Sequence, residues 1–428
     1  MRFTWLIITI VSAILLIGNY FLSTADRMEG WDQNIQLSGS DSDSISFEII
    51  DSILQTSIRD AVIPGAVVLV NRDGKTIYER AFGYAQLYAF GKKPLTAPEL
   101  MTSQHRFDLA SLTKVFATTF GIMLLYEQHK IDLELPAYRY LPEFRSQSKD
   151  SITIRHLLTH TAGLHPWRPI YYHAKTPAES RRYITHLPLK YPVGAGRHYS
   201  DLGFMLLGYI IEELSGVSID SFLSENLYQP LSLEYTSFNP DPNGPPFAAT
   251  SHGNPFEKKM VFEDDFGYDC DEDPTSFTGW RNYVLKGEVN DGNAYYAHQG
   301  EAGHAGLFST AQELKILLDL LLNQGQYRGK RILSDKTIKA FIKKDRFGHG
   351  LGWAMSPDAI PVKNLPAGSF GHTGFTGTFV VGIPKYHLSV IILTNRQNLD
   401  VNSDGTYNSL TGLRMAVTET ILDLVARQ

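Results

Sequence analysis

The order of sequence patterns along this 428-residue chain predicts an α+β fold. β-Rich runs lie near both ends, at residues 64–83 and 378–394. Helical patterns and loops rich in proline and glycine alternate between them, to about residue 330. Because strands and helices are segregated along the chain, we expect one antiparallel sheet built from the N- and C-terminal segments, with helices on its faces. The mostly helical part between them is expected to form an inserted lobe.

The N-terminal β-rich run is predicted to be a hairpin. The sequence GAVVLVNR is followed by Asp73-Gly74 and then by KTIYERAFG. An Asp-Gly pair between two β-rich runs is a strong hairpin signal, because both residue types tolerate the positive φ of a tight turn. Residues 112–128 then change to a helical pattern of apolar positions. A helix is therefore expected directly after the first sheet segment.

Two further helices are expected in the middle of the chain. Residues 202–214 are strongly apolar, and a Ser-Gly pair follows them as a stop signal. Thr310 and Glu313 have the spacing of a capping box. This spacing predicts a helix over residues 314–321.

The C-terminal segment completes the predicted sheet. Residues 378–383 and 388–394 are β-rich, and the short turn at 384–387 joins them. These runs predict a second hairpin. Residues 413–426 have a helical pattern and are expected to close the chain.

The first 25 residues are expected to be a membrane anchor or a signal sequence. Arg2 precedes the apolar stretch 3–22, and mostly acidic residues follow it. This arrangement indicates export, with the body of the protein outside the cytoplasm. The stretch is close to the roughly 20 residues that span a bilayer, which favours a retained single-pass anchor. Ser23 and Ala25 leave cleavage by a signal peptidase as the alternative, which would give a secreted protein.

The remaining chain is expected to hold one linker and one catalytic domain. Residues 26–46 contain a Ser/Asp-rich stretch without aromatics at 33–44, which is typical of a flexible tether. Since strands at both ends belong to one sheet, residues 47–428 are expected to form one interwoven domain instead of two sequential ones.

The composition excludes some functions. Hydrophobic residues make up 43% and charged residues 20% of the chain, which is ordinary for a globular protein. The formal net charge of -6 argues against nucleic acid as a partner, since phosphate binding requires a basic surface. Cys270 is the single cysteine, so no intrachain disulfide can form.

Ser111 and Lys114 form an S-x-x-K sequence at the start of the predicted helix 112–128. Residues three apart on a helix share a face, so the amine can approach the hydroxyl and activate it as a nucleophile. A second S-x-x-K, Ser146 to Lys149, lies in a polar run without an apolar helix behind it. The motif alone is therefore weak, and Ser111 could also serve only as a helix cap.

Two further short motifs stand out. Tyr199 and Asp201 form the only Tyr-x-Asp or Tyr-x-Asn, at the junction between a glycine-containing loop and the predicted helix 202–214. His372-Thr373-Gly374 is the sole His-Thr-Gly or Lys-Thr-Gly, directly before a β-rich run. Each has a plain structural alternative: an N-cap aspartate beside a core aromatic for the first, and a glycine-rich strand start for the second.

Taken together, these motifs resemble those of the serine β-lactamase and penicillin-binding protein superfamily. There, S-x-x-K, Tyr-x-Asn and Lys-Thr-Gly line one cleft in this order. The resemblance is strongest to the class C-like branch, including penicillin-binding proteins of the 4B type, and covers roughly residue 47 to the C-terminus. Longer matching stretches support it, at residues 156–164, 199–216, 303–314 and 371–378.

The resemblance implies a role for each matching residue. Ser111 attacks the acyl carbonyl, and Lys114 and Tyr199 share the work of the general base. The backbone N–H groups of Ser111 and Phe375 form the oxyanion hole. The substrate-binding positions are Asp201, His372, Thr373 and Gly374. No metal ion and no organic cofactor is expected.

Two residues depart from the family pattern. Asp201 replaces the usual Asn, so an acceptor-only carboxylate stands in place of an amide. His372 replaces the usual Lys, so its positive charge is expected to be partial near neutral pH. Both changes reduce the positive potential that would hold a substrate carboxylate. The chain is therefore expected to be a weak β-lactamase that prefers peptide or ester substrates.

Other kinds of site are less well supported. The sequence has no G-x-S-x-G and no H-E-x-x-H motif. The spacing of His156, His160, His165 and His173 fits no common metal site, and His160 is expected to be a structural hydrogen-bonding residue. The acidic run 264–273 is expected to be a solvated loop.

The predicted function is that of a serine hydrolase acting through an acyl-enzyme on cell-wall-type peptides at a bacterial cell membrane. A D-alanyl-D-alanine carboxypeptidase is the leading expectation. An esterase acting on D-alanyl, acetyl or small acyl esters is one alternative. A non-catalytic penicillin-binding protein or sensor of wall fragments, which acylates without turnover, is another.

Overall fold

The computed structural model describes residues 47–357 and 359–426. The expected anchor or signal and the expected linker, residues 1–46, lie outside this part. Among the described residues, no single helix is long and apolar enough to cross a membrane. One pair of helices, Asp201–Ser215 and Ile219–Tyr228, meets the requirements of length and apolarity only jointly, across a bend of 68°.

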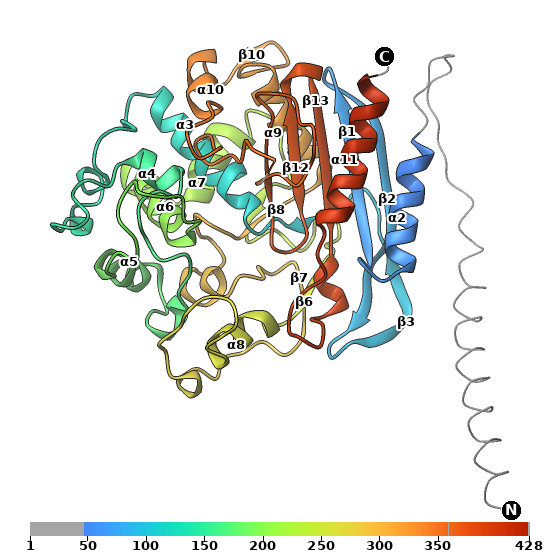
Figure 1. Cartoon of the computed structure of the whole chain (residues 1–428), viewed down its shortest axis with the longest axis horizontal. Coiled ribbons are helices and arrows are strands. Elements are labelled where there is room, and N and C mark those ends of the chain that lie inside the picture. Colours follow the sequence, from blue (N-terminus) through green and yellow to red (C-terminus); the bar gives the residue numbers. More distant parts are fainter. Residues whose placement is uncertain (1–46, 358, 427–428) are drawn as a thin grey trace, which may run out of the picture. The chain divides into compact units, whose positions relative to one another are not determined.

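The main sheet is built from both ends of the chain, as predicted (Figure 1). Its six strands are all antiparallel, in the order β11-β12-β13-β1-β2-β3. Strand β1 pairs with β13 from Ala66 opposite Thr394 to Arg72 opposite Leu388, which joins the two termini. The strands are β1 (Gly65–Arg72), β2 (Lys75–Ala89), β3 (Lys93–Leu100), β11 (Phe370–Thr373), β12 (Phe379–Ile383) and β13 (Leu388–Thr394).

Both predicted hairpins are confirmed. In the first, Arg72 pairs with Lys75, and Asp73 and Gly74 take φ values of 51° and 76°. The second joins β12 to β13 through a turn of 3₁₀ helix. Strand β3 was not predicted, because two prolines interrupt its sequence and remove the β signal.

Each face of the sheet belongs to a different core. Along β1, Val67 and Leu69 face the core shared with the lobe, whereas Val68 and Val70 face the opposite core. That second core is covered by helices α2 (Glu48–Arg59) and α11 (Thr411–Ala426), which lie side by side (Figure 1). Burial on both faces explains why β1 is continuously apolar instead of alternating.

The lobe lies on the other face and is mostly helical (Figure 1). Helix α9 (Ala311–Leu322) packs against β1 and β13 from this side. The other helices are α3 (Phe120–Glu127), α4 (Ile154–Leu158), α5 (Pro177–His186), α6 (Asp201–Ser215), α7 (Ile219–Leu223), α8 (Pro255–Phe262) and α10 (Asp335–Phe341). Segments of π-helix are η1 (Lys114–Thr119), η5 (Ser224–Tyr228) and η7 (Asn293–Ala297).

Short elements complete the described chain. The 3₁₀ turns are η2 (Ala137–Arg139), η3 (Pro142–Phe144), η4 (Ile170–Tyr172), η6 (Pro274–Ser276), η8 (Pro384–Tyr386) and η9 (Arg396–Leu399). The short strands are β4 (Phe107–Asp108), β5 (Ser237–Phe238), β6 (Ala249–His252), β7 (Val284–Lys286), β8 (Leu307–Ser309), β9 (Gln326–Tyr327) and β10 (Lys330–Arg331).

The predicted helices all form, and their ends have clear causes. The side chain of Ser200 accepts a hydrogen bond from the N–H of Gly203 and caps α6. Gly216, with φ 75°, ends this helix in the left-handed conformation. At α9 the Thr310 side chain caps the helix, but the Glu313 carboxylate accepts from the Glu234 N–H at 2.6 Å. Glu313 therefore ties α9 to the segment before β5.

Candidate active site

The nucleophile candidate Ser111 lies at a strained turn between β4 and the helical segment η1–α3. Ala110, the residue before it, has φ +46°, which is costly for a side chain with a Cβ. The Asp108 carboxylate supports this turn by accepting from the N–H groups of Ala110 (2.8 Å) and Asn290 (2.6 Å). The backbone N–H of Lys114 then bonds to Ser111 O at 3.1 Å, so Ser111 opens the predicted helix.

Two donors meet at the Ser111 hydroxyl. Lys114 Nζ lies 3.0 Å from Ser111 Oγ, on the same helical face. Tyr199 OH lies 2.8 Å from the same oxygen, although the two residues are 88 positions apart in the chain. The structure thus brings together the three residues that the sequence singled out for the acylation chemistry.

Lys114 is fully buried, and polar groups surround its ammonium. Besides Ser111 Oγ, Nζ contacts Asp201 Oδ1 at 2.7 Å and the carbonyl of His304 at 3.0 Å. Burial lowers the pKa of Lys114, but the charge of Asp201 and its hydrogen bond outweigh this and raise the pKa above its ordinary value. Lys114 is therefore an ammonium ion at neutral pH.

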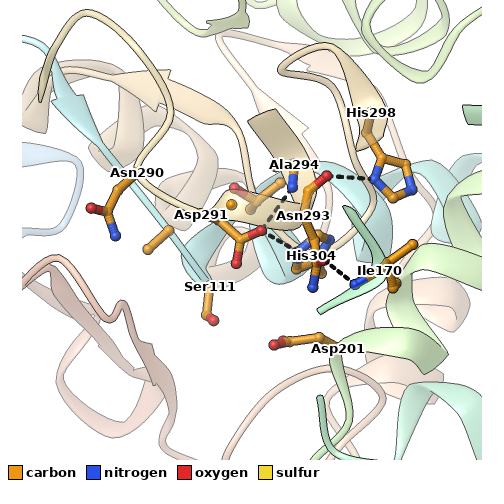
Figure 2. Close-up of polar contacts among 12 residues, drawn as sticks. Ser111, Ile170, Asp201, Asn290, Asp291, Asn293, Ala294, His298 and His304 are labelled. Atoms are coloured by element: carbon orange, nitrogen blue, oxygen red, sulfur yellow. Dashed lines mark hydrogen bonds and ion pairs between the residues drawn. The ribbon is translucent and has the colours of Figure 1, made fainter. Parts of the chain in front are cut away.

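Asp201 is the counter-ion of that ammonium. Ser200, not Asp201, caps α6, which leaves the Asp201 carboxylate free to turn toward Lys114. Figure 2 shows Asp201 and Ser111 on neighbouring walls of the same space. The departure from the family asparagine thus places a negative charge directly beside the lysine.

Tyr199 is held by a buried histidine. The His160 ring lies against the Tyr199 ring, with centroids 4.5 Å apart. His160 Nδ1 accepts from the N–H of Ser200 at 3.0 Å, and burial keeps the pKa of His160 well below its ordinary value. The prediction that His160 is a structural hydrogen-bonding residue is confirmed. Burial also raises the pKa of Tyr199 despite the opposing effect of Lys114, so the phenol is protonated at rest.

His372 lies on β11, with its ring centroid 6.2 Å from that of Tyr199. Its Nδ1 is 2.8 Å from the carbonyl of Thr373. Burial, followed by the charge of Lys114, lowers the pKa of His372 to about 3. The prediction that His372 carries a partial positive charge near neutral pH is therefore wrong, because its imidazole is neutral.

The end of β11 packs against the residues that precede Ser111. A Cβ on Gly374 would lie 2.4 Å from the carbonyl oxygen of Leu109, so only glycine permits this approach. Thr376 Oγ1 donates to Asp108 O at 2.7 Å, and Thr378 Oγ1 donates to Leu109 O at 3.1 Å. Gly374 thus allows two backbone segments of this chain to pack closely, whereas the sequence predicted a substrate-binding position here.

Phe375 follows directly and is fixed through its carbonyl. That oxygen accepts from Arg396 Nη2 at 2.7 Å and from Gln397 Nε2 at 3.2 Å. Within the described part of the chain, the backbone N–H groups of Ser111 and Phe375 donate no backbone hydrogen bond. Two unused N–H groups on adjoining segments match the requirement for an oxyanion hole.

A cavity of 430 Å³ adjoins Ser111. Tyr199, Asp201 and Phe375 of the predicted set line it. Sequence reasoning missed two other residues of its wall, Glu257 and Asp291. Neither belongs to a short motif with a recognisable spacing, and only their common position at the cavity identifies them.

Asp291 is bound to the stretch 303–314 that matched the family. Its Oδ1 accepts from His304 Nε2 at 2.9 Å and from the Ala294 N–H at 2.8 Å (Figure 2). Burial raises the pKa of Asp291, but His304 and the Ala294 N–H outweigh this and bring it to about 2. Since His304 O also accepts from Lys114, this histidine joins the second carboxylate to the catalytic lysine.

Other polar side chains outside the acylation site have structural partners. His298 is buried between Tyr209 OH (2.7 Å) and Asn293 O (2.8 Å). The described residues contain no group of three or more His, Cys, Asp or Glu side chains that could hold a metal ion. The acidic run 264–273 is not wholly solvated, because Glu272 is buried in an ion pair with Arg168 at 2.7 Å.

A serine hydroxyl held by a buried lysine and a tyrosine beside two free backbone N–H groups defines a serine hydrolase. Residues 50–412 match the Beta-lactamase family model, and the chain belongs to this family. Its fold is similar to a class C β-lactamase from Rhodobacter sphaeroides, with a TM-score of 0.62 and 18% identity over 88% of this chain and 99% of that one.

Two sequence relatives are considerably closer. The chain is 34% identical to the N-acetylmuramyl-L-alanine amidase of Bacillus subtilis (strain 168), over 82% of this chain and 81% of the relative. It is 32% identical to a Salmonella agona (strain SL483) protein named as a D-alanyl-D-alanine carboxypeptidase, over 84% of both chains. Both names describe hydrolysis of an amide bond.

Proposed function

We propose that this chain hydrolyses amide bonds in cell-wall-type peptides through an acyl-enzyme on Ser111. The observation that carries the proposal is the pair of hydrogen bonds from Tyr199 (2.8 Å) and Lys114 (3.0 Å) to Ser111 Oγ. A hydroxyl becomes a nucleophile when a positioned group takes its proton, and Tyr199 OH is within the distance that this transfer requires.

The reaction follows from the charges of the site. Lys114 is held as an ammonium by Asp201, so Tyr199 acts as the base after it has lost its own proton to solvent, and the nearby ammonium favours this phenolate form. The Ser111 proton then passes to the phenolate oxygen. Ser111 Oγ then attacks the carbonyl, and the Ser111 and Phe375 N–H groups bind the oxyanion. Tyr199 returns the proton to the leaving amine. Water attacks the resulting ester, releases the carboxylic acid and regenerates Ser111.

The charges also favour one kind of bond. A substrate carboxylate beside the scissile bond would meet a neutral His372 and the anionic Asp201, without the lysine that this family normally provides. We therefore favour cleavage at an amide that no free carboxylate adjoins, such as the muramyl-L-alanine linkage named for the B. subtilis relative.

A D-alanyl-D-alanine carboxypeptidase is the second candidate. The Salmonella relative supports it, as does β11, an edge strand that ends at Thr373 and along which a peptide can form main-chain hydrogen bonds. An esterase acting on small acyl esters uses the same acylation and hydrolysis steps. A protein that acylates without turnover uses the acylation step alone.

The test offers residues 47–428 a muramyl pentapeptide and identifies the products by mass spectrometry. We expect separation of the sugar from an intact pentapeptide, whereas a carboxypeptidase would release only D-alanine. A nitrophenyl ester and a fluorescent penicillin test the esterase and the stable-adduct alternatives. Ser111→Ala is the control, and turnover that survives in this variant would refute the acyl-enzyme.

A variant can restore the lysine that the family pattern has at position 372, and the same assay can measure its effect. His372→Lys supplies the cation, and a charge-assisted hydrogen bond of about 1.5–3 kcal/mol predicts roughly 10- to 100-fold faster acylation by benzylpenicillin. The rate on the muramyl amide is expected to change much less. An equal gain on both substrates would contradict the charge argument.

We also propose that the apolar segment 3–22 places this domain outside the cytoplasm, at the bacterial membrane where such peptides occur. Fractionation of cells that express the full chain checks this setting. Activity confined to the soluble cytoplasmic fraction would exclude it.

A further inference from the structure

The cavity beside Ser111 has an unusual wall. Three carboxyl side chains line it, those of Asp201, Glu257 and Asp291. No lysine, arginine or histidine within residues 47–357 and 359–426 lines it. The rings of Trp167 and Phe375 contribute much of the rest, together with other aromatic and apolar groups.

Glu257 and Asp291 are brought together from separate elements. Glu257 projects from α8, and Asp291 directly precedes the segment that leads into η7. The N–H of Gly292 donates to Glu257 Oε1 at 2.8 Å, which places this carboxyl beside the residue that follows Asp291. A Cβ on Gly292 would lie 2.1 Å from Glu257 Oε2, so any other residue here would require the carboxyl to move.

Of the three carboxyls, Glu257 alone has no basic side chain as its partner among residues 47–357 and 359–426. Asp201 is paired with Lys114 and Asp291 with His304. Within the described part of the chain, Glu257 accepts from neutral donors, the Gly292 N–H and, at 3.5 Å, Tyr171 OH. Burial and the neighbouring Asp291 raise the pKa of Glu257 to about 8. Arg281 acts on Glu257 from farther away, and its guanidinium bonds to Glu288 and to the carbonyl groups of residues 289 and 290.

The aromatic part of the cavity wall favours a cationic ligand, as the carboxyl groups do. Phe256, next to Glu257 on α8, packs edge to face against Phe375, with centroids 5.1 Å apart. Aromatic faces attract cations, and this attraction grows when water is excluded. Rings together with these carboxyl groups form a site for an organic ammonium group, because a cation bound beside Glu257 lowers its pKa and favours its ionised form.

We propose that this cavity is a specificity pocket for substrates that carry an ammonium group near the scissile carbonyl, bound by Glu257 and Asp291 among the rings of Phe256, Trp167 and Phe375. The proposal rests on the acyl-enzyme function and names the class of substrate that Ser111 accepts. A free amino group of a wall peptide, or of an aminoacyl ester, has this chemistry.

Two nitrophenyl esters of equal shape test the proposal. The 4-(trimethylammonio)butyrate ester carries a charge that does not titrate, and the 5,5-dimethylhexanoate ester replaces its nitrogen by carbon. We expect kcat/KM for the cationic ester to exceed that for the neutral ester by about tenfold. Glu257→Gln keeps the side-chain shape and is expected to bring this ratio close to one.

The matched control is Glu263→Gln, which removes an exposed carboxyl just beyond the same helix and is expected to leave the ratio unchanged. Equal rates on both esters in the unaltered protein would overturn the pocket while leaving the acyl-enzyme intact, and this comparison needs no variant to fold. An unchanged ratio in a folded Glu257→Gln protein would equally overturn it. Failure to acylate with either ester would instead refute the proposed function.

Discussion

Two segments of this protein have the same S-x-x-K spacing, Ser111 to Lys114 and Ser146 to Lys149, and both lysines are buried. Their hydroxyls differ. Ser111 Oγ is 3.0 Å from its lysine, whereas Ser146 is exposed and its Oγ lies 3.4 Å from that of Ser148. The second serine is part of a tight turn that Asp150 closes, and no helix carries its lysine toward it.

The two lysines also differ in charge. Lys149 Nζ donates to the carbonyl of Thr185 at 2.6 Å, and burial without a nearby carboxylate lowers the pKa of Lys149. Lys114 has the Asp201 carboxylate at 2.7 Å, and the pKa of Lys114 is raised. The four-residue motif therefore fixes neither the contact nor the protonation state, and both come from segments distant in the sequence.

The largest expected effect separates the two lysines by function. Lys114→Met removes the cation that stabilises Tyr199 as a phenolate, and we expect acylation of Ser111 to fall about 10²- to 10⁴-fold. Lys149→Met leaves the carbonyl of Thr185 without its donor, so unfolding free energy is expected to drop by about 1–3 kcal/mol while acylation changes little. Stopped-flow acylation and thermal unfolding measure the two effects.

Circular dichroism of both variants serves as the control for folding. If a folded Lys114→Met protein acylates at the original rate, the conclusion that Lys114 but not Lys149 supports acylation is wrong. It is equally wrong if a folded Lys149→Met protein has lost acylation to the same extent as Lys114→Met.

A smaller effect concerns the carboxylate that distinguishes Lys114. The charge of Asp201 raises the pKa values of Lys114 and Tyr199. Asp201→Asn removes that charge, so both pKa values fall: Tyr199 loses its proton at lower pH, and Lys114 also becomes neutral at lower pH. We expect the whole profile of kcat/KM against pH to move to lower pH, measured with a substrate that does not titrate.

The matched control is Asp269→Asn, which removes a surface carboxylate paired with Lys190. It is expected to leave the profile in place. A profile of Asp201→Asn that stays in place, or moves to higher pH, would show that Asp201 does not set the charge of this site.

Local signals were sufficient for most of the fold. The Asp73-Gly74 turn, the apolar run of residues 202–214 and the Thr310 cap each act within a few residues, and each element forms as predicted. Strand β3 escaped prediction because its pairing with β2 depends on backbone hydrogen bonds, which its proline-containing sequence does not reveal.

The site was predictable only where chemistry follows a short motif. Ser111, Lys114 and Tyr199 were named in this way, and the structure brings them within hydrogen-bonding distance. The neutral state of His372 could not be predicted, because it depends on burial and on a lysine 258 positions earlier in the chain. Glu257 depends likewise on its distance from Asp291, which the fold alone determines.

The smallest expected effect is the most direct test of the comparison. Ser146→Ala removes an exposed hydroxyl whose side-chain partner among the described residues is Ser148, so we expect unfolding free energy to stay within about 0.5 kcal/mol and acylation to be unchanged. Ser111→Ala, the same chemical change at the same motif position, is expected to abolish acylation. Labelling by fluorescent penicillin, followed by peptide mapping, reads both variants at once. Label on the peptide that contains Ser146, or label lost in Ser146→Ala, would mean that spacing alone suffices. Label confined to Ser111 would mean that the buried pairing of Lys114 with Asp201, and the approach of Tyr199, turn the motif into a nucleophile.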